Sequence, residues 1–382
     1  MRLYDLVDPH KLMEHQNNGM VSQQKHPTLP LYILNYTHKA QYEPAWGDGT
    51  IDYCRGLIID EDYNIVARPF KKFHNLNTAS IPETLEANLP KTTPTITQKY
   101  DGSLGILWQY RGDYGIATRG SFTSPQALWA TKWLKDRIEG RINDYPLEMP
   151  ETGVLRSYTW LFEIIYSGNR IVVSYPFEGL VLLGAVAKNN GRELPHSAVT
   201  AIGERKGYRV TPQIKGKNLF DCMQDNNPNE EGYVVTYSLG SGTGPLKIKI
   251  KMADYLRLHR IVTGMNPRSV WELLKNRVIL EDKFVGCPDD FMKWLSRWVL
   301  KLNSEFDKIA ADTNEIYINR PFFDGTDARR YRAECAAYFF RQNRPELKSI
   351  FFLMLDGKNV DEAIWNMFEP RGDDKTFRTE EE

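Results

Sequence analysis

The order of hydrophobic and polar residues divides the chain into a strand-rich first part and a helical last part. Short apolar or alternating runs, bounded by turn residues, recur up to about residue 255, a pattern typical of β-strands. In the first 90 residues such runs are 31–34, 57–60 and 65–67. Glycine-containing turns at 110–114 and 187–191 separate further runs. The pattern therefore predicts antiparallel β architecture, interrupted by one amphipathic helix over 124–138.

Beyond residue 256 the hydrophobic period changes from two to between three and four. Apolar residues recur at this helical spacing at Phe291, Trp294, Leu295, Trp298, Val299, Leu302, Phe306 and Ile309. Because they share one helical face, the tryptophans are predicted to form a core and not a base-stacking platform. Further helices are expected at 268–280, 326–343 and 360–368. The predicted fold class is α+β: an antiparallel-β domain over 1–258, a small all-helical domain over 259–370, and a polar, frayed tail over 371–382.

Composition limits the function classes. The 382 residues include 49 basic and 49 acidic side chains, so no whole-molecule field would attract a polyanion, and any nucleic-acid contact must come from local basic patches. The four cysteines are widely spaced, which disfavours a zinc site and a disulfide framework. The first residues lack a signal-peptide pattern, and the longest apolar run is too short to cross a membrane. These features predict a cytoplasmic protein without a membrane partner.

The stretch Gln98–Leu104 places a lysine, Lys99, at the end of a predicted strand, followed by a turn at Asp101-Gly102. An amine can act as a nucleophile only after losing its proton, which requires desolvation, neighbouring cations or a metal ion. Asp101 would orient the amine, and Gly102 would let a phosphate or sugar approach the backbone. A surface lysine in a turn is the commoner origin of this short pattern.

Two carboxylates and a row of lysines are further candidates. Glu163 lies within the apolar run 160–165, where a buried charge needs a partner or a metal ion, although a core ion pair would also explain it. Glu231 enters a strand from an Asn-rich loop and is suited to reach Mg²⁺, although an ordinary acidic loop is the alternative. Strict alternation over 246–251 projects three lysines from one strand face. They would either protect a sheet edge or hold a phosphate and lower the pKa of a nucleophilic lysine.

Two cations in the first part could bind phosphate. Arg55 precedes Gly56 at the start of an apolar strand, where its guanidinium could form a fork with a phosphate. Lys72 lies between aromatic residues that would limit its exposure to water. A turn arginine and a solvated lysine pair are the alternatives for these two patterns.

Taken in order, the motifs around Lys99, Glu163, Glu231 and Lys249–Lys251 resemble the covalent nucleotidyltransferase superfamily, which includes polynucleotide ligases and mRNA capping enzymes. Additional features are similar to the phage-type RNA ligases of the first, tRNA-repair family. These are Cys54-Arg55-Gly56, Lys72-Phe73 before Asn75-Leu76-Asn77, Arg119-Gly120-Ser121 before Gln126-Ala127, Asn169-Arg170-Ile171-Val172, and Tyr255 to Leu258-His259. The resemblance covers about residues 30–260.

The resemblance implies an ATP-dependent ligase whose Lys99 attacks the α-phosphate of ATP and carries AMP. RNA with 5′-phosphate and 3′-hydroxyl ends, including cleaved tRNA, is the implied substrate. It also implies β- and γ-phosphate contacts by Arg55 and Lys72, and a phosphate or RNA contact by Arg119. Lys249 and Lys251 would be nearest the α-phosphate, and are preferred to Lys247 by counting back from Tyr255 and His259. Glu231 would hold Mg²⁺ (or Mn²⁺), and Glu163 would contact the ribose or a metal-bound water.

The sequence also departs from the family pattern. Leu34 stands where the family often has a tyrosine, and His74 replaces an expected aromatic residue. Glu281 and Asp282 fall near a family acidic pair linked to metal, and the helical domain would help to select the RNA. The resemblance implies a monomer that acts in the host cytoplasm if it is phage-encoded. A GTP-dependent capping-type enzyme and a non-catalytic RNA-end-binding relative remain alternatives, although a capping enzyme would be expected to have a β-rich oligonucleotide-binding domain after the lysine strand.

Overall fold

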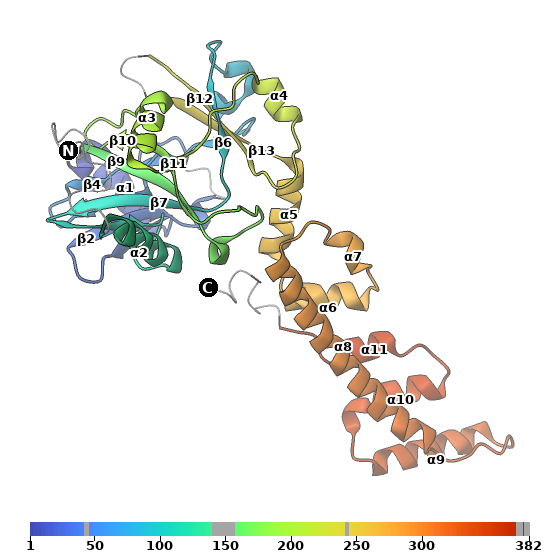
Figure 1. The fold of residues 1–382 in the computed structure, drawn as a ribbon. Helices are drawn as coiled ribbons and strands as arrows, with labels where there is room; N and C mark the ends of the chain where they lie inside the picture. Colours follow the sequence, from blue (N-terminus) through green and yellow to red (C-terminus); the bar gives the residue numbers. More distant parts are fainter. Residues whose placement is uncertain (42–45, 140–156, 241–243, 372–376, 378–382) are drawn as a thin grey trace. The chain divides into compact units, whose positions relative to one another are not determined.

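The computed structural model describes residues 1–41, 46–139, 157–240, 244–371 and residue 377 (Figure 1). The chain forms two compact units, Met1–Arg257 and Leu258–Glu382. In their described parts, the first contains three β-sheets with helices and the second is helical. The predicted α+β class with antiparallel sheets is therefore confirmed.

The described residues of the first unit form three sheets, whose strands mostly pair in antiparallel fashion. One sheet has the order β1 (Val21–Lys25), β2 (Leu31–Tyr36), β3 (Arg55–Asp60), β4 (Ile65–Ala67). The second has the order β11 (Arg209–Val210), β10 (Gly179–Ala187), β9 (Tyr158–Ile165), β7 (Ser103–Tyr110), β8 (Asp113–Ala117). The third has the order β5 (His74–Asn75), β13 (Leu246–Lys251), β12 (Gly232–Tyr237), β6 (Thr95–Lys99). Among the strands that the structure describes, only the short end strands β11 and β5 pair in parallel with their neighbours.

The helices of the first unit are more numerous than the sequence pattern predicted. The helix expected over 124–138 is present as α2 (Pro125–Glu139), but α3 (His196–Lys206) and α4 (Leu219–Gln224) also interrupt the strands. Another helix, α1 (Pro9–Asn17), precedes the first strand. The expectation of a single interruption is therefore wrong. Helix α3 buries few large side chains, and α4 has only six residues. Neither therefore shows a clear helical repeat of apolar residues in the sequence.

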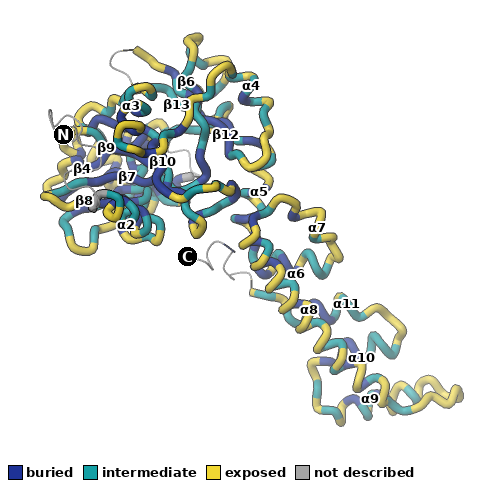
Figure 2. Tube along the Cα trace, viewed as in Figure 1, coloured by how far each residue is buried: buried dark blue, intermediate teal, exposed yellow. Residues whose placement is uncertain are grey.

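Apolar side chains from both sheet and helix fill the core of the five-stranded sheet. Buried residues Leu134 of α2, Val199 of α3, Phe162 of β9 and Leu182 of β10 belong to one cluster. Buried positions follow these strands through the middle of the unit (Figure 2). The continuous apolar strands β9 and β10 are covered on a face by helices, and Glu163 is the one charged residue of β9.

The second unit is a set of helices around an aromatic core. Its elements are α5 (Ala253–Gly264), which contains the boundary between the units, then α6 (Pro267–Lys275), α7 (Leu280–Lys283), α8 (Asp289–Ile318), α9 (Ala328–Arg341), α10 (Lys348–Leu355) and α11 (Asp361–Trp365). Trp294 is fully buried beside Phe291, which confirms that the tryptophan stripe is core. The helix expected over 268–280 ends earlier, because Arg277 adopts a positive φ of 53°.

Residue 377 corrects the expectation of a frayed tail. The Phe377 ring lies 5.5 Å from that of Phe291 and 5.7 Å from that of Trp294, and its side chain is buried. Its backbone N–H donates to the carbonyl of Met265. The other residues of 372–382 lie outside the described part. In the described residues, no helix is both long and apolar enough to cross a membrane.

Candidate active site

Strand register brings the predicted nucleophile and the lysine row to one glycine. Gly232, the first residue of β12, is paired with Lys99 at the end of β6 on one side and with Lys251 at the end of β13 on the other. Gly232 has φ +143°, and a Cβ there would collide with the carbonyl oxygen of Ile250. A glycine is therefore needed where the three strands meet. Glu231, the residue before it, is thereby placed between the two lysines.

Glu231 binds both lysines directly. Its Oε2 lies 2.6 Å from Lys99 Nζ and its Oε1 lies 2.9 Å from Lys251 Nζ. The carboxylate side chain is only 3% exposed, whereas the two lysine side chains are 21% and 20% exposed. The ion pairs are therefore buried on the carboxylate side and reachable on the ammonium side.

The electrostatic setting of Lys99 differs from the one expected. Burial by itself would lower the pKa of Lys99, but the carboxylates of Glu231 and Glu163 outweigh it and raise the pKa above the ordinary lysine value. Burial would raise the pKa of Glu231, but Lys99 and Lys251 outweigh it and lower the pKa. The expectation that cationic neighbours keep Lys99 unprotonated is therefore wrong for the ligand-free protein.

Lys249 has the lowered pKa that was expected for the nucleophile. Burial, reinforced by Lys72, Lys251 and Lys99, lowers the pKa of Lys249 to about 7. By contrast, Lys247 on the same strand face forms an ion pair with Glu193 and lies over the ring of Phe70. Lys249 thus interacts with the cationic cluster, whereas Lys247 is neutralised by Glu193.

Glu163 faces this cluster from β9 of the neighbouring sheet. Burial raises the pKa of Glu163 to about 7, against the opposing effect of Lys99. Gly102 lies against the same strand, because a Cβ on it would meet the carbonyl oxygen of Ile164 at 2.5 Å and the Glu163 side chain at 3.1 Å. Close packing of this turn on β9 is therefore sufficient to require a glycine at position 102, whether or not a ligand binds there.

Asp101 stabilises the turn after Lys99 and does not bond to the amine. Its Oδ2 accepts from the backbone N–H groups of Val172 and Val173 at 2.8 and 2.9 Å, and its Oδ1 accepts from the Tyr255 hydroxyl at 2.8 Å. The expectation that Asp101 orients the Lys99 amine is therefore wrong in this structure. It connects the nucleophile turn to the segment after β9 and to α5.

A second group of cations gathers around Tyr36 at the end of β2. Arg119 Nη1 donates to the Tyr36 hydroxyl at 2.9 Å, and Lys72 Nζ donates to it at 3.1 Å. Arg55 starts β3, and its Nη1 is buried without a hydrogen-bond partner among the described residues. Gly56, with φ +89°, lets this strand approach the backbone of Arg119. Burial would raise the pKa of Tyr36, but Arg119, Lys72 and Arg55 outweigh it and lower the pKa.

Aromatic rings surround the Lys72 ammonium. Its Nζ lies 4.5 Å from the ring centroid of Tyr36 and 4.7 Å from that of Trp46. The His74 ring lies 5.6 Å from Trp46 in an edge-on arrangement, so the imidazole occupies the place of the expected aromatic residue. Burial and the nearby Lys72 and Lys249 charges lower the pKa of His74 to about 4. The imidazole is therefore neutral at physiological pH.

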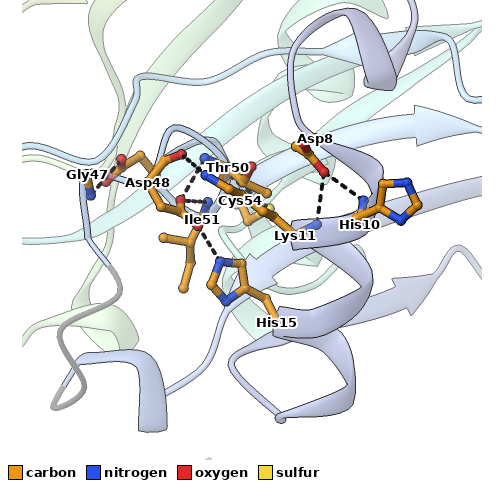
Figure 3. A network of polar contacts seen from close by, with 10 residues as sticks. Asp8, His10, Lys11, His15, Gly47, Asp48, Thr50, Ile51 and Cys54 are labelled. Atoms are coloured by element: carbon orange, nitrogen blue, oxygen red, sulfur yellow. Dashed lines mark hydrogen bonds and ion pairs between the residues drawn. The ribbon is translucent and has the colours of Figure 1, made fainter.

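A polar network fixes the loop that carries Trp46 (Figure 3). Asp48 Oδ1 accepts from the backbone N–H groups of Thr50 and Ile51 at 2.8 and 3.0 Å, and Asp48 Oδ2 lies 2.6 Å from His15 Nε2. Lys11 Nζ donates to the Asp48 carbonyl at 3.2 Å. Both His15 and Lys11 lie on α1. The helix before the first strand therefore anchors a loop of the candidate site.

The remaining predicted metal-linked residues belong to the second unit. Glu281 and Asp282 are exposed on α7 of the second unit. Lys99, Glu163, Glu231, Lys249, Lys251, Arg55, Lys72, Arg119 and Gly102 all belong to the first unit and are linked by the contacts and charge interactions described above.

Comparison with protein families matches residues 53–255, more than half of the chain, to the family described as RNA ligase. This chain belongs to the RNA ligase family. The family-level prediction is therefore confirmed. The matched segment contains Arg55, Lys99, Glu163, Glu231 and Lys249, whereas Tyr36 and Trp46 of the candidate site precede it.

Individual relatives are distant. An RNA ligase of Rhodothermus phage RM378 is 22% identical over 366 residues, which cover 80% of this chain and 81% of the relative. A putative bifunctional polynucleotide kinase/RNA ligase of Autographa californica nuclear polyhedrosis virus is 26% identical over 76% of this chain, which spans only 41% of that protein. Solved Naegleria gruberi RNA ligase with PPi is 16% identical, with a TM-score of 0.33 over 44% of this chain and 52% of that one.

The carboxylates of this RNA ligase family member fit a magnesium site that is completed by substrate. No group of three or more His, Cys, Asp or Glu side chains within the described ranges is arranged to hold a metal ion. Glu231 and Glu163 nevertheless interact across the site. Mg²⁺ is commonly held by one or two carboxylates together with phosphate oxygens and water. Two acidic side chains beside a cluster of cations match that requirement.

Sequence reasoning missed Tyr36 and Trp46. It sought an aromatic residue at Leu34, which is fully buried in the core. The register between β2 and β3 shifts between Leu34 and Asn35, and Tyr36, near the strand end, carries the hydroxyl to the cations. The signal available was a tyrosine two residues further along, on the same face of an alternating strand.

Proposed function

We propose that this chain is an ATP-dependent RNA ligase that joins 5′-phosphate and 3′-hydroxyl RNA ends through a lysyl-AMP at Lys99. The arrangement that carries the proposal is the Glu231 carboxylate held between Lys99 and Lys251, with Lys249 beside them. Adenylyl transfer requires one lysine for covalent chemistry, carboxylates for a divalent cation and further lysines for phosphate.

In the first step, Lys99 Nζ forms a bond to the α-phosphorus of ATP, and the bond from that phosphorus to the bridging oxygen of pyrophosphate breaks. The ammonium must first release a proton. Because Glu231 is the nearest carboxylate and raises the pKa of Lys99, neutralising the Glu231 charge would lower that pKa. Lys249 and Lys251 would stabilise the charge that develops on the α-phosphate oxygens.

Arg55 and Lys72 would bind the outer phosphates and orient pyrophosphate as the leaving group. The buried Arg55 Nη1 has a donor to offer a phosphate oxygen. Arg119, tied to Lys72 through Tyr36, would contact a phosphate of ATP or RNA. Glu231, and Glu163 through water, would hold Mg²⁺ or Mn²⁺, which when bound supplies neutralising charge for the phosphoryl oxygens.

In the later steps, an RNA 5′-phosphate oxygen attacks the α-phosphorus of lysyl-AMP, and the P–N bond breaks to return the Lys99 amine. The RNA 3′-hydroxyl then attacks the activated 5′-phosphorus, loses its proton and expels AMP. Cleaved tRNA is the proposed natural substrate. The helical unit, including Glu281 and Asp282, would contribute to RNA choice and metal-linked contacts.

The test is to mix the protein with labelled ATP or GTP, a divalent cation and a 5′-phosphorylated single-stranded RNA. Label retained on the protein from ATP, an adenylated RNA intermediate and circular product are expected. Label retained only from GTP would favour a capping-type reaction, and RNA binding without any retained label would favour a non-catalytic relative. An intact mass that never gains an adenylate would overturn the proposal.

A further inference from the structure

Lys72 is held in a different way from Lys99 and Lys251 of the site. Lys99 and Lys251 share Glu231, and the neighbouring Lys71 lies 3.8 Å from Asp52. In the described part of the chain, no carboxylate lies within ion-pair distance of Lys72. Its ammonium is instead enclosed by the Tyr36 and Trp46 rings, whose centroids are 4.9 Å apart and whose planes are nearly perpendicular, at 88°.

This arrangement fixes a cation without neutralising it. A carboxylate partner would compete with an incoming phosphate and cancel the lysine charge. An aromatic face attracts the cation through its quadrupole and leaves the full positive charge available. Lysine also has many rotamers to lose when it is ordered, and the two rings restrict those rotamers before a ligand arrives.

The backbone around Lys72 is tied to the loop that carries Trp46. The Lys72 N–H donates to the Asp52 carbonyl at 2.9 Å, and the Asp52 carboxylate accepts from the N–H of Gly47 at 3.1 Å. Asp48 in the same loop is anchored to His15 of α1. The backbone that carries the ammonium and the loop that carries the indole are therefore both held in place through Asp52, and α1 also holds the loop.

We propose that Trp46 is a positioning residue for the adenylation step. With Tyr36 it holds the Lys72 ammonium for the outer phosphates of ATP, and the Asp48–His15 contact fixes its loop. This inference rests on the proposed function. The outer phosphates leave as pyrophosphate in the first step and are absent from the sealing step. Loss of Trp46 should therefore impair reaction with ATP and spare the joining of RNA that is already adenylated.

The experiment uses the full chain with Trp46→Leu, which keeps apolar bulk without a π face, and Trp46→Phe, which keeps a smaller face. Trp46→Leu should raise the KM for ATP in protein adenylation about tenfold, and Trp46→Phe should raise it less. Sealing of adenylated RNA without ATP should be unchanged in both. Trp129→Leu, which removes a ring stacked on Tyr166 at 4.4 Å, is the matched control for general loss of aromatic packing and should leave the KM for ATP unchanged.

Asp48→Ala provides a second variant that removes no ring. It should weaken the loop anchor and raise the KM for ATP less than Trp46→Leu does, again without affecting sealing. An unchanged KM for ATP in Trp46→Leu would overturn the inference. Equal losses in adenylation and sealing would also overturn it, because they indicate a general structural role. If the unsubstituted protein never becomes adenylated, the proposed function fails instead.

Discussion

The two units of the molecule place their charges in different environments. In the first unit, Glu231 is almost fully buried and holds two lysines whose side chains are about one-fifth exposed. In the second unit, ion pairs such as Arg268–Glu369 and Arg330–Glu334 lie at the surface, with side chains that are 39–79% exposed. In the interior of the helical unit, aromatic rings such as those of Trp294 and Phe351 are fully buried.

This difference separates charges that solvate a surface from charges that are arranged for chemistry. Removing a charged group from water is costly unless it is paired, and exposed pairs add little to stability. Burying several lysines and carboxylates together therefore costs desolvation free energy that an apolar core would not cost. Such clusters with shifted pKa values are typical of active sites.

The largest expected effect is the loss of the nucleophile. Lys99→Ala should reduce protein adenylation and ATP-dependent RNA joining by at least about 10³-fold, because no other group replaces a covalent nucleophile. Sealing of adenylated RNA should persist, since it does not use the amine. Arg330→Ala on the helical unit removes a cation of an exposed pair and is the control. If RNA joining is unchanged by Lys99→Ala, the buried charges of the first unit are not arranged for this chemistry.

The next effect compares a buried carboxylate with an exposed pair. Glu231→Gln leaves Lys99 and Lys251 without their shared partner and should lower the free energy of unfolding by about 3 kcal/mol. Arg268→Ala breaks the exposed pair with Glu369, and should change it by less than about 1 kcal/mol. Denaturant unfolding of both variants measures the difference. Equal destabilisation would mean that burial does not distinguish these ion pairs.

A third prediction uses the pKa of Lys249, about 7 in the ligand-free protein. Above this pH each further unit lowers the protonated fraction about tenfold, so phosphate binding should weaken and the KM for ATP should rise with pH. Lys249→Arg keeps its charge throughout and should flatten this rise between about pH 7 and 9. Because Glu163 also has a pKa of about 7, Glu163→Gln is measured in parallel, and it should retain the rise.

The same residue has a stability consequence of known sign. Its pKa is lower in the folded protein than the ordinary lysine value of about 10.4, so the unfolded chain binds more protons between about pH 7 and 10.4. The free energy of unfolding should therefore increase with pH across this window, and Lys249→Met should reduce the increase. If Lys249→Met leaves the slope unchanged, this lysine is not titrating in the folded protein.

Local patterns predicted the elements that carry the site. Alternation over β13 indicated which lysines share a face, and the lone acid in β9 marked Glu163. Sequence could not supply the distances between them. The pairing of Gly232 with both Lys99 and Lys251 is set by long-range register, and it places Glu231 close enough to reverse the pKa shift expected for Lys99.

Irregular backbone accounts for the other differences. The register shift between β2 and β3, where Gly56 has a positive φ, lies beside Tyr36. The Tyr36 ring shares a core cluster with Leu34, but its hydroxyl accepts hydrogen bonds from the cations. Trp46 reaches Lys72 from a loop held by α1, and a loop has no period from which to predict a contact. The weakly patterned helix α3 was missed for the related reason that it buries few large side chains.

The smallest effect tests the hydroxyl that links Lys72 and Arg119, the two cations proposed to bind phosphate. Tyr36→Phe keeps the ring beside Lys72 but removes the acceptor of hydrogen bonds from Lys72 and Arg119. A hydrogen bond to a charged group contributes about 1.5–3 kcal/mol. Because these bonds orient the two cations and do not contact ATP, only part of that energy should affect ATP binding, and the KM for ATP should rise by about tenfold or less. Thr313→Val removes a buried hydroxyl of the helical unit that bonds only to the Ile309 carbonyl of its own helix, and should leave this KM unchanged. If Thr313→Val raises the KM for ATP more than Tyr36→Phe does, the contact of the Tyr36 hydroxyl with Lys72 and Arg119 is not what matters for ATP binding.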